Sequence, residues 1–265
     1  MKPYYDEGGI TLYCGRCEEV LPMLTEKFRL VFTSPPYNLG NTVHPYSGFP
    51  NKKLGHYPNG AKLSARGGHG KWSGGSLANG YGAHDDAMPH EEYVAWQQAV
   101  LRLCWGALDD SGAIYYNHKP RIMNGVLVPP AAYLPPELPV RQEVIWARAG
   151  GINFSPAFYL PTHERIVIVA KPDFRLKSKG ASGAGDVWQF TQEHGNSHPA
   201  PFPLGLPTAA IETTGCKSIL DPFAGSGTTL RAAKDAQIRG VGIELEEQWC
   251  EYTARRLEQG VLAFG

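Results

Sequence analysis

Short apolar runs, each bounded by Gly, Pro or Asp, recur along the whole chain. They lie at residues 10–13, 30–33, 113–117, 143–147, 165–170, 218–220 and 240–244. Most of them are continuously apolar rather than alternating, which is typical of strands buried on both faces of a mainly parallel sheet. We therefore interpret all seven runs as strands.

Between several of these strands, apolar residues recur at three- and four-residue spacing, which predicts helices over residues 93–108, 228–236 and 246–257. A glycine follows each helix and is predicted to end it: Gly112, Gly240 and Gly260. Strands that alternate with helices predict an α/β fold, an open sheet with helices on both faces.

The composition favours one large folded domain, with 42% apolar and 19% charged residues over 265 positions. The formal net charge is zero, so any nucleic-acid binding has to come from local basic patches. Five scattered cysteines favour a reducing compartment over a disulfide framework. No apolar run approaches the roughly 20 residues of a membrane helix, and the first residues, MKPYYDEGG, lack a signal-peptide core. We expect a soluble, cytoplasmic protein with no membrane partner.

Two loop-rich stretches interrupt the alternation of strands and helices. Residues 41–84 contain ten glycines and no acid, and their basic residues are Lys52, Lys53, Lys62, Arg66 and Lys71. This stretch is either a flexible insertion or a basic, aromatic-bearing loop that becomes ordered on nucleic acid. Residues 171–203 begin with a second set of basic side chains: Lys171, Arg175, Lys177 and Lys179.

The stretch VFTSPPYN, residues 31–38, leaves an apolar strand for two consecutive prolines. Two prolines remove two backbone donors and fix two φ angles, so the turn is stiff and its carbonyl oxygens are free to accept hydrogen bonds. Ser34, Pro35, Pro36 and Tyr37 are therefore predicted to form a rigid acceptor site at a strand end. The alternative is a tight turn with a buried tyrosine and no chemical role.

A second motif, SILDPFAGSGTTLRAA, indicates a strand, an Asp-Pro break, a glycine turn and a helix. Gly225 and Gly227 allow the backbone to approach a ligand closely, and the helix offers free N–H groups to a carboxylate or phosphate. Glu244 lies about 23 residues past Asp221, at the end of the next strand, where an acid can bind both hydroxyls of a ribose. Asp221 is alternatively only a turn-forming residue before Pro222.

Three kinds of ligand compete for this second motif. An ATPase phosphate loop ends in Gly-Lys-Ser/Thr, and GSGTT has no lysine. A nicotinamide site follows Gly-x-Gly-x-x-Gly, and the third glycine is missing. A ligand with an amino-acid head and a ribose fits best, and S-adenosylmethionine is such a ligand. The predicted cofactor-binding residues are Asp221, Pro222, Phe223, Ala224, Gly225, Ser226, Gly227, Thr228, Thr229 and Glu244.

Taken together, the two motifs resemble a known family. DPFAGSGTT is similar to the cofactor loop of the S-adenosylmethionine-dependent DNA amino-methyltransferases, and TSPPYN resembles their catalytic (Ser/Asp/Asn)-Pro-Pro-Tyr motif. The catalytic motif comes first and the cofactor loop nearly 190 residues later, an order that resembles the permuted β group of these enzymes. Further segments resemble the family in the expected order: ITLYCGRCEEVLPML, FYLPTHERIVIVAKP, HPAPFPLGLP and GVGIELEEQWCEYTARRL.

This resemblance implies a Rossmann-like methyltransferase fold, circularly permuted, with a mainly parallel seven-stranded sheet. It implies a catalytic half over residues 1–170, a target-recognition segment over 171–203 and a cofactor-binding half over 204–265. It also places His198 and Phe202 at the far wall of the cofactor site. The remaining conspicuous residues, His163, Glu164, Trp96 and Trp105, are interpreted as structural.

One segment departs from the family pattern. Where the family often has Gly-Asp-Cys, this chain has Gly15-Arg16-Cys17. If the family's Asp contacts the cofactor, Arg16 removes that contact. Cys14 and Cys17 form a C-x-x-C pair, but zinc needs four ligands and no second Cys or His pair lies nearby in the sequence. We expect no metal site.

The chemistry of this family implies a catalytic role for the turn that contains the two prolines. An exocyclic amino group is a poor nucleophile because its lone pair is delocalised into the ring, and acceptors aimed at its two N–H bonds favour a tetrahedral nitrogen. The Ser34 hydroxyl and the Pro35 carbonyl can be these acceptors, and Tyr37 can stack on the base. A paired base must first leave the duplex, at a cost of roughly a few kcal/mol. Methylation of cytosine C5 instead needs a Pro-Cys nucleophile, which the sequence lacks.

The resemblance therefore implies a bacterial or phage-encoded, site-specific DNA methyltransferase, in which Ser34 favours the N4 amine of cytosine over the N6 amine of adenine. Its partners would be double-stranded DNA, a cognate restriction endonuclease and a second copy of itself. The predicted DNA-binding residues are Asn38, Lys52, Lys53, Lys62, Arg66, Lys71, Arg175, Lys177 and Lys179. Two rival functions remain: a related transferase acting on RNA or on a protein glutamine, and a non-catalytic DNA-binding protein on this fold.

Overall fold

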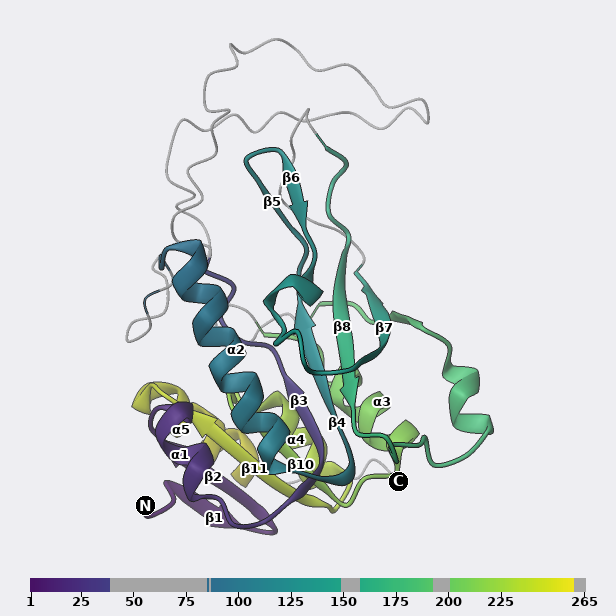
Figure 1. Cartoon of the computed structure of the whole chain (residues 1–265). Helices are drawn as coiled ribbons and strands as arrows, with labels where there is room; N and C mark the ends of the chain where they lie inside the picture. The colour runs from purple at the N-terminus through teal and green to yellow at the C-terminus, as the bar shows by residue number, and fades with distance from the viewer. Residues whose placement is uncertain (39–84, 86, 149–157, 193–200, 260–265) are drawn as a thin grey trace, which may run out of the picture.

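The protein is built around a nine-stranded sheet, shown by the computed structural model in Figure 1. The structure describes residues 1–38, 85, 87–148, 158–192 and 201–259. The strand order in this sheet is β1-β2-β11-β10-β3-β4-β8-β7-β9, and β5 and β6 form a separate hairpin. The strands are β1 (Tyr5–Glu7), β2 (Ile10–Cys14), β3 (Phe28–Thr33), β4 (Leu108–His118), β5 (Arg121–Met123), β6 (Val126–Val128), β7 (Val140–Ala147), β8 (His163–Ala170), β9 (Val187–Gln189), β10 (Ser218–Asp221) and β11 (Arg239–Glu244).

Helices cover both faces of the sheet, as predicted (Figure 1). One face carries α1 (Cys17–Val20) and α2 (His90–Ala107), and the other carries α3 (Gly205–Thr214), α4 (Thr228–Asp235) and α5 (Glu247–Glu258). Along β3, Leu30 and Phe32 belong to one hydrophobic cluster, whereas Val31 belongs to the other. The strand is thus buried on both sides, which explains its continuous apolar sequence. In the part of the chain that the structure describes, no helix combines the length and apolar character that crossing a membrane requires.

All seven predicted strands are present, but the predicted count of seven is wrong. β1 adds to one edge, antiparallel to β2, and β9 adds to the other, parallel to β7. Each has only three residues and lies at an edge of the sheet, so neither carries a continuous apolar run. Five neighbouring strands, β2, β11, β10, β3 and β4, are mutually parallel, and β8 is antiparallel to both β4 and β7.

Two of the glycines predicted to end helices do not do so, although α2 and α4 end within one residue of their predicted bounds. Gly112 lies inside β4, where a Cβ would meet the Phe28 carbonyl at 3.0 Å, so this glycine serves strand packing. Gly240 lies inside β11, and Gln237 takes the left-handed conformation after α4, with φ of 53°. Both glycines sit where a strand approaches a neighbour closely. Gly260 lies outside the described residues.

The parallel strands place their carboxyl ends along one edge of the sheet. Glu244 pairs with Cys14, Asp221 with Gly242, and Thr33 with Tyr116, so the ends of β2, β11, β10, β3 and β4 lie side by side. Ligands of open α/β sheets bind at this edge. Both sequence motifs follow these strand ends, SPPY after β3 and DPFAGSG after β10.

Candidate active site

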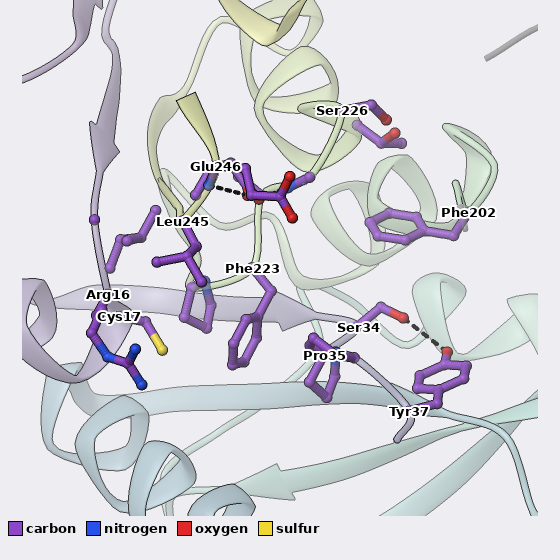
Figure 2. Close-up of a pocket in the computed structure, with 18 of the residues that line it drawn as sticks. Arg16, Cys17, Ser34, Pro35, Tyr37, Phe202, Phe223, Ser226, Leu245 and Glu246 are labelled. Carbon is purple, nitrogen blue, oxygen red and sulfur yellow. Dashed lines mark hydrogen bonds between the residues drawn. The ribbon is translucent and has the colours of Figure 1, made fainter. Parts of the chain in front are cut away.

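A pocket at the carboxyl edge of the sheet brings the two motifs together (Figure 2). Ser34, Pro35, Pro36 and Tyr37 line one side, which we call the catalytic wall. The opposite side, which we call the cofactor wall, is lined by Pro222, Phe223, Ala224, Gly225, Ser226, Thr228 and Glu244. Motifs that are far apart in the sequence therefore face one cavity.

The loop between β10 and α4 gives the cofactor wall its shape. Gly225 and Gly227 have φ of 52° and 76°, a left-handed conformation that glycine adopts without a Cβ clash. A Cβ on Gly227 would lie 2.4 Å from Cγ2 of Thr253 on α5. Gly225 lines the pocket, whereas Gly227 lets the loop pack against α5.

Asp221 supports this wall from behind. Its carboxylate is fully buried and accepts hydrogen bonds from the Phe223 amide at 3.0 Å and from Thr229 Oγ1 at 2.6 Å. Burial raises the pKa of Asp221 to about 7. Three of the residues predicted to bind the cofactor, Asp221, Gly227 and Thr229, thus lie behind the pocket surface and shape the loop whose other residues line it.

Glu244 is held by the same loop. Its Oε2 accepts from the Gly225 amide and its Oε1 from the Glu246 amide, both at 2.8 Å. Burial raises the pKa of Glu244. Because an ionised carboxylate offers about four acceptor sites, Glu244 retains capacity for two ribose hydroxyls at the pocket surface.

The segment after β2 also reaches the pocket. Arg16 and Glu18 line it together with Trp96 from α2. Trp96 Nε1 donates to Glu18 Oε1 at 2.6 Å, and Arg16 Nη2 lies 3.6 Å from the same oxygen. The family's Asp is absent at position 16, yet Glu18 brings a carboxylate to this wall. Trp96, interpreted as a core residue, packs against the core and lines the pocket as well.

Two aromatic side chains complete the apolar part of the pocket (Figure 2). Phe223 meets Trp96 edge-on, with ring centroids 5.5 Å apart. Phe202 is buried and packs on Phe32 at a centroid distance of 5.5 Å. The structure therefore places Phe202 at the pocket, as expected, while His198 lies outside the described residues.

On the catalytic wall, the two prolines present their carbonyls differently. The Pro36 carbonyl accepts a hydrogen bond from the Tyr93 hydroxyl at 2.8 Å. Within the described residues, no hydrogen bond engages the Pro35 carbonyl. Asn38, at φ of 55°, is buried and donates its side-chain amide to the Met88 carbonyl at 2.8 Å. The turn is thus anchored through Pro36 and Asn38, and Pro35 keeps an acceptor available.

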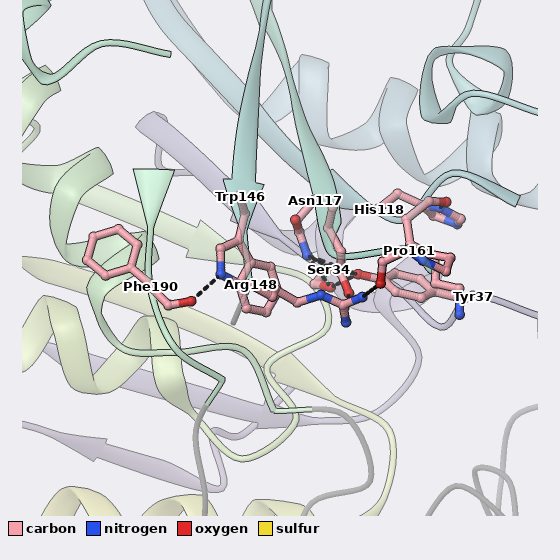
Figure 3. Close-up of polar contacts among 10 residues, drawn as sticks. Ser34, Tyr37, Asn117, His118, Trp146, Arg148, Pro161 and Phe190 are labelled. Carbon is pink, nitrogen blue, oxygen red and sulfur yellow. Dashed lines mark hydrogen bonds and ion pairs between the residues drawn. The ribbon is translucent and has the colours of Figure 1, made fainter. Parts of the chain in front are cut away.

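Ser34 belongs to a side-chain network that the sequence motifs did not reveal (Figure 3). Its Oγ lies 2.9 Å from Tyr37 Oη, which donates to Glu164 Oε2 at 2.8 Å. Asn117 Nδ2 lies within hydrogen-bond distance of Ser34 Oγ, Tyr37 Oη and Glu164 Oε2, at 3.2, 2.9 and 3.0 Å. Arg148 Nη1 pairs with Glu164 Oε1 at 3.1 Å. Glu164, interpreted as structural, directly contacts the catalytic motif.

The Tyr37 ring is held in place by His118. Their ring centroids are 4.3 Å apart, and His118 is fully buried between Tyr37 and Tyr133. Burial lowers the pKa of His118 to about 3, so the imidazole is neutral at physiological pH. His118 Nε2 also lies 2.8 Å from the Tyr93 hydroxyl that anchors Pro36. The ring predicted to stack on a base is therefore fixed before any base arrives.

Three of the predicted DNA-binding residues lie away from the pocket. Arg175, Lys177 and Lys179 are exposed beyond the end of β8, where Lys171 N bonds to the Gly112 carbonyl at the amino end of β4. These residues thus lie at the amino ends of the parallel strands, whereas the pocket lies at their carboxyl ends. The remaining basic residues of the prediction lie outside the described residues: Lys52, Lys53, Lys62, Arg66 and Lys71.

No group of three or more His, Cys, Asp or Glu side chains among the described residues is arranged to hold a metal ion. Cys14 and Cys17, the C-x-x-C pair, are both free thiols. Cys17 is buried at the pocket, and burial raises the pKa of its thiol. The pocket offers the carboxylates of Glu18, Glu244 and Glu246, backbone amides and aromatic rings, with a hydroxyl and a carbonyl on the catalytic wall as acceptors.

The sequence profile of the DNA methylase family N6_N4_Mtase matches residues 28–255, which include both walls of the pocket. The chain belongs to this DNA methylase family. The resemblance to DNA amino-methyltransferases of the N4/N6 type is thereby confirmed at the level of the family.

Curated relatives of this DNA methylase span most of its length. Type II methyltransferase M.ScaI of Streptomyces caespitosus is 25% identical, with 97% of this chain and 84% of that protein covered. Type II methyltransferase M.HpaI of Haemophilus parainfluenzae is 24% identical, with 93% and 74% covered. Both relatives are type II methyltransferases by name.

Solved structures confirm the α/β methyltransferase fold of the DNA methylase. The PvuII DNA methyltransferase, which is cytosine-N4-specific, superposes with a TM-score of 0.68 at 17% identity, covering 99% of this chain and 91% of that chain. TTHA0409 of Thermus thermophilus, solved in complex with S-adenosyl-L-methionine, superposes with a TM-score of 0.61 at 20% identity, covering 96% and 95%.

Proposed function

We propose that this DNA methylase transfers the methyl group of S-adenosylmethionine to the exocyclic amino group of a base flipped out of double-stranded DNA, with N4 of cytosine favoured. When bound, S-adenosylmethionine supplies an electrophilic methyl sulfonium. Glu244 accepts the ribose hydroxyls, and the backbone at Gly225 and the start of α4 faces the amino-acid end. The bound S-adenosyl-L-methionine of the structurally similar TTHA0409 supports this assignment.

The acceptor pair on the catalytic wall carries this proposal. A serine hydroxyl has one proton and two lone pairs. Ser34 Oγ lies against Tyr37 Oη and Asn117 Nδ2, which leaves one lone pair, and the neighbouring Pro35 carbonyl is free of hydrogen bonds from the described residues. Two free acceptors on a rigid turn match the two N–H bonds of an amino group and increase the nucleophilicity of its nitrogen.

Two observations favour cytosine N4 over adenine N6. The first position of the catalytic motif is a neutral hydroxyl, Ser34, rather than a carboxylate. The PvuII enzyme, whose structure superposes over nearly the whole chain, is cytosine-N4-specific. Adenine N6 is the alternative, because a hydroxyl accepts equally well from either amine.

The chain order supports membership of the permuted β group. The catalytic turn follows β3, and the cofactor loop follows β10, which is next to β3 in the sheet but much later in the chain. Residues 1–170 then form the catalytic half and residues 204–265 the cofactor-binding half, with target recognition between them in 171–203.

DNA contacts are proposed for residues 41–84, for Asn38, and for Arg175, Lys177 and Lys179. Deleting residues 52–80 should weaken DNA binding or change the preferred site; unchanged affinity and preference would exclude that loop.

Replacing Arg175, Lys177 and Lys179 by alanine should reduce the salt dependence of DNA binding by about one unit of slope per lost phosphate contact. An unchanged slope would remove these three residues from the interface.

We further propose a bacterial or phage-encoded protein that acts in the cytoplasm beside a cognate restriction endonuclease. The type II methyltransferases among its relatives support this setting. A homodimer is proposed as well, and sedimentation of the purified protein with and without DNA tests it.

Methyl transfer from labelled S-adenosylmethionine to unmethylated genomic DNA, followed by mass spectrometry of the digested nucleosides, tests the function. We expect N4-methylcytosine. N6-methyladenine would keep the enzyme class and reject the base preference. Bound cofactor with no label in DNA would reject DNA as the substrate, and absence of cofactor binding would favour a non-catalytic DNA-binding protein.

A further inference from the structure

We propose that Glu164 is the terminal proton acceptor of a relay, from Ser34 through Tyr37 to Glu164, that removes the proton released when the target amino group is methylated. This inference rests on the proposed function and assigns a role to a strand, β8, that carries neither sequence motif. Figure 3 labels Ser34 and Tyr37 of this relay, together with Asn117 and Arg148 beside it. Glu164 is a positioning residue in this scheme, because it acts on the substrate only through Tyr37 and Ser34.

The direction of each hydrogen bond follows from the protons available. Tyr37 has a single hydroxyl proton, and it points to the Glu164 carboxylate at 2.8 Å, which accepts only. Tyr37 Oη is therefore the acceptor in the 2.9 Å contact with Ser34 Oγ, and Ser34 is the donor. The chain of donors thus runs from Ser34 to Tyr37 to Glu164 and ends on a negative charge.

Charged and polar groups surround the Glu164 carboxylate. The side chain is 8% exposed and pairs with Arg148 at 3.1 Å through its other oxygen. Asn117 directs its Nδ2, not its carbonyl, at Glu164 Oε2, Tyr37 Oη and Ser34 Oγ. An amide donor at this position suits an ionised carboxylate, and charge-assisted hydrogen bonds are the stronger ones.

The proton balance of the reaction requires such an acceptor. As the N–C bond to the methyl group forms, the S–C bond breaks and its electron pair stays on sulfur, so the positive charge passes to the amino nitrogen. That nitrogen loses a proton to Ser34 Oγ, while Ser34 gives its own proton to Tyr37 and Tyr37 gives its proton to Glu164 Oε2. The methylated base leaves neutral, and Glu164 returns its proton to water after product release.

Glu164→Gln and Tyr37→Phe test the relay, because the first removes the charge and the second removes the connecting hydroxyl but keeps the ring. In single-turnover assays at saturating S-adenosylmethionine and DNA, each should lower the methylation rate about 100-fold, the scale of general acid–base catalysis. Dissociation constants for S-adenosylmethionine and DNA should be unchanged. Glu143→Gln is the matched control, since Glu143 forms a 2.9 Å ion pair with Arg165 on the same pair of strands.

Two double variants separate a relay from a structural role. The double variant Tyr37→Phe/Glu164→Gln should be no slower than Tyr37→Phe alone, because both changes break one chain. The double variant Glu164→Gln/Arg148→Gln restores the charge balance of the buried pair and should remain slow. Recovery of the wild-type rate in the second, or multiplied losses in the first, would overturn the relay.

A fully active Glu164→Gln in an active wild-type background overturns the relay alone. A wild-type protein that methylates no DNA overturns the proposed function together with the relay. If Glu164→Gln fails to fold or to bind S-adenosylmethionine, Tyr37→Phe decides: a wild-type rate rejects the relay, and a rate about 100-fold lower supports it.

Discussion

The cofactor wall and the catalytic wall of the pocket are built in different ways. The cofactor wall comes from one continuous unit, β10, loop, α4 and β11, and it presents backbone amides held by two left-handed glycines. The catalytic wall is a network of side chains, in which Ser34 meets Asn117 on β4 and Tyr37 meets Glu164 on β8. We infer that changes in the first wall act on cofactor affinity and on stability, and that changes in the second act on the rate of methyl transfer.

The largest effect should follow from Ser34→Ala. Losing a preorganised polar group that stabilises developing charge lowers catalytic rates by about 10²- to 10³-fold, so we expect that loss in single-turnover rate at saturating S-adenosylmethionine. The affinity for S-adenosylmethionine should stay at the wild-type value. Thr25→Ala, at an exposed position in the loop before β3, is the control. Equal losses of rate and affinity would mean that the two walls are not separable.

Glu244→Gln should mainly weaken binding of S-adenosylmethionine. Both Glu244 oxygens accept a backbone amide, so the amide group of a glutamine would set one N–H against another. Hydrogen bonds to a charged group contribute about 1.5–3 kcal/mol, which corresponds to an affinity loss of about 10- to 100-fold measured by calorimetric titration. Glu247→Gln, on the exposed side of α5, should bind normally. Normal binding by Glu244→Gln would remove this carboxylate from the cofactor site.

Gly227→Ala tests whether the loop is held by its fit against α5. An added Cβ would lie 2.4 Å from Thr253 Cγ2. Gly125 in the β5–β6 turn has a similar φ of 79°, but a Cβ there meets nothing within 4 Å. Gly227→Ala should therefore reduce the free energy of unfolding by about 1–3 kcal/mol more than Gly125→Ala, the scale of overpacking, in urea titrations. Equal losses would attribute the effect to φ alone.

A further expected effect is a dependence of stability on pH caused by Asp221. Its pKa is about 7 in the folded protein and about 3.9 in an unfolded chain. Between these two pH values the carboxyl is ionised in the unfolded chain and protonated in the folded protein. The free energy of unfolding therefore falls as pH rises through this window. Asp221→Asn should gain stability relative to the wild type between about pH 4 and pH 7, as urea titrations can show. If the stability difference between Asp221→Asn and the wild type did not change with pH, the pKa of Asp221 would be the same in the folded and the unfolded protein.

The same contrast explains what could be read from the sequence. The cofactor wall is local: DPFAGSGTT and the end of GVGIE lie within one strand–helix–strand unit, so their spacing predicts the glycine turn and Glu244. What spacing could not predict is which of these residues face the cavity. Asp221 and Gly227 face away from the cavity, because their partners Thr229 and Thr253 lie on the helices that pack behind the loop.

The catalytic wall could be predicted only in part. SPPY itself is visible, but its partners Asn117 and Glu164 lie 83 and 127 residues from the motif residues they contact. Their positions depend on strand order, since β4 and β8 become neighbours of β3 only in the folded sheet. A weak signal did exist: polar residues at the strand ends AIYYNH and THERIV mark the carboxyl edge once the antiparallel direction of β8 is known.

The dependence of the single-turnover methylation rate on S-adenosylmethionine concentration, measured for Ser34→Ala and Glu244→Gln, tests the division between the two walls most directly. We expect Glu244→Gln to approach the wild-type rate at saturation and Ser34→Ala to remain slow at every concentration. A Ser34→Ala variant restored by more S-adenosylmethionine, or a Glu244→Gln variant that stays slow at saturation, would contradict this account.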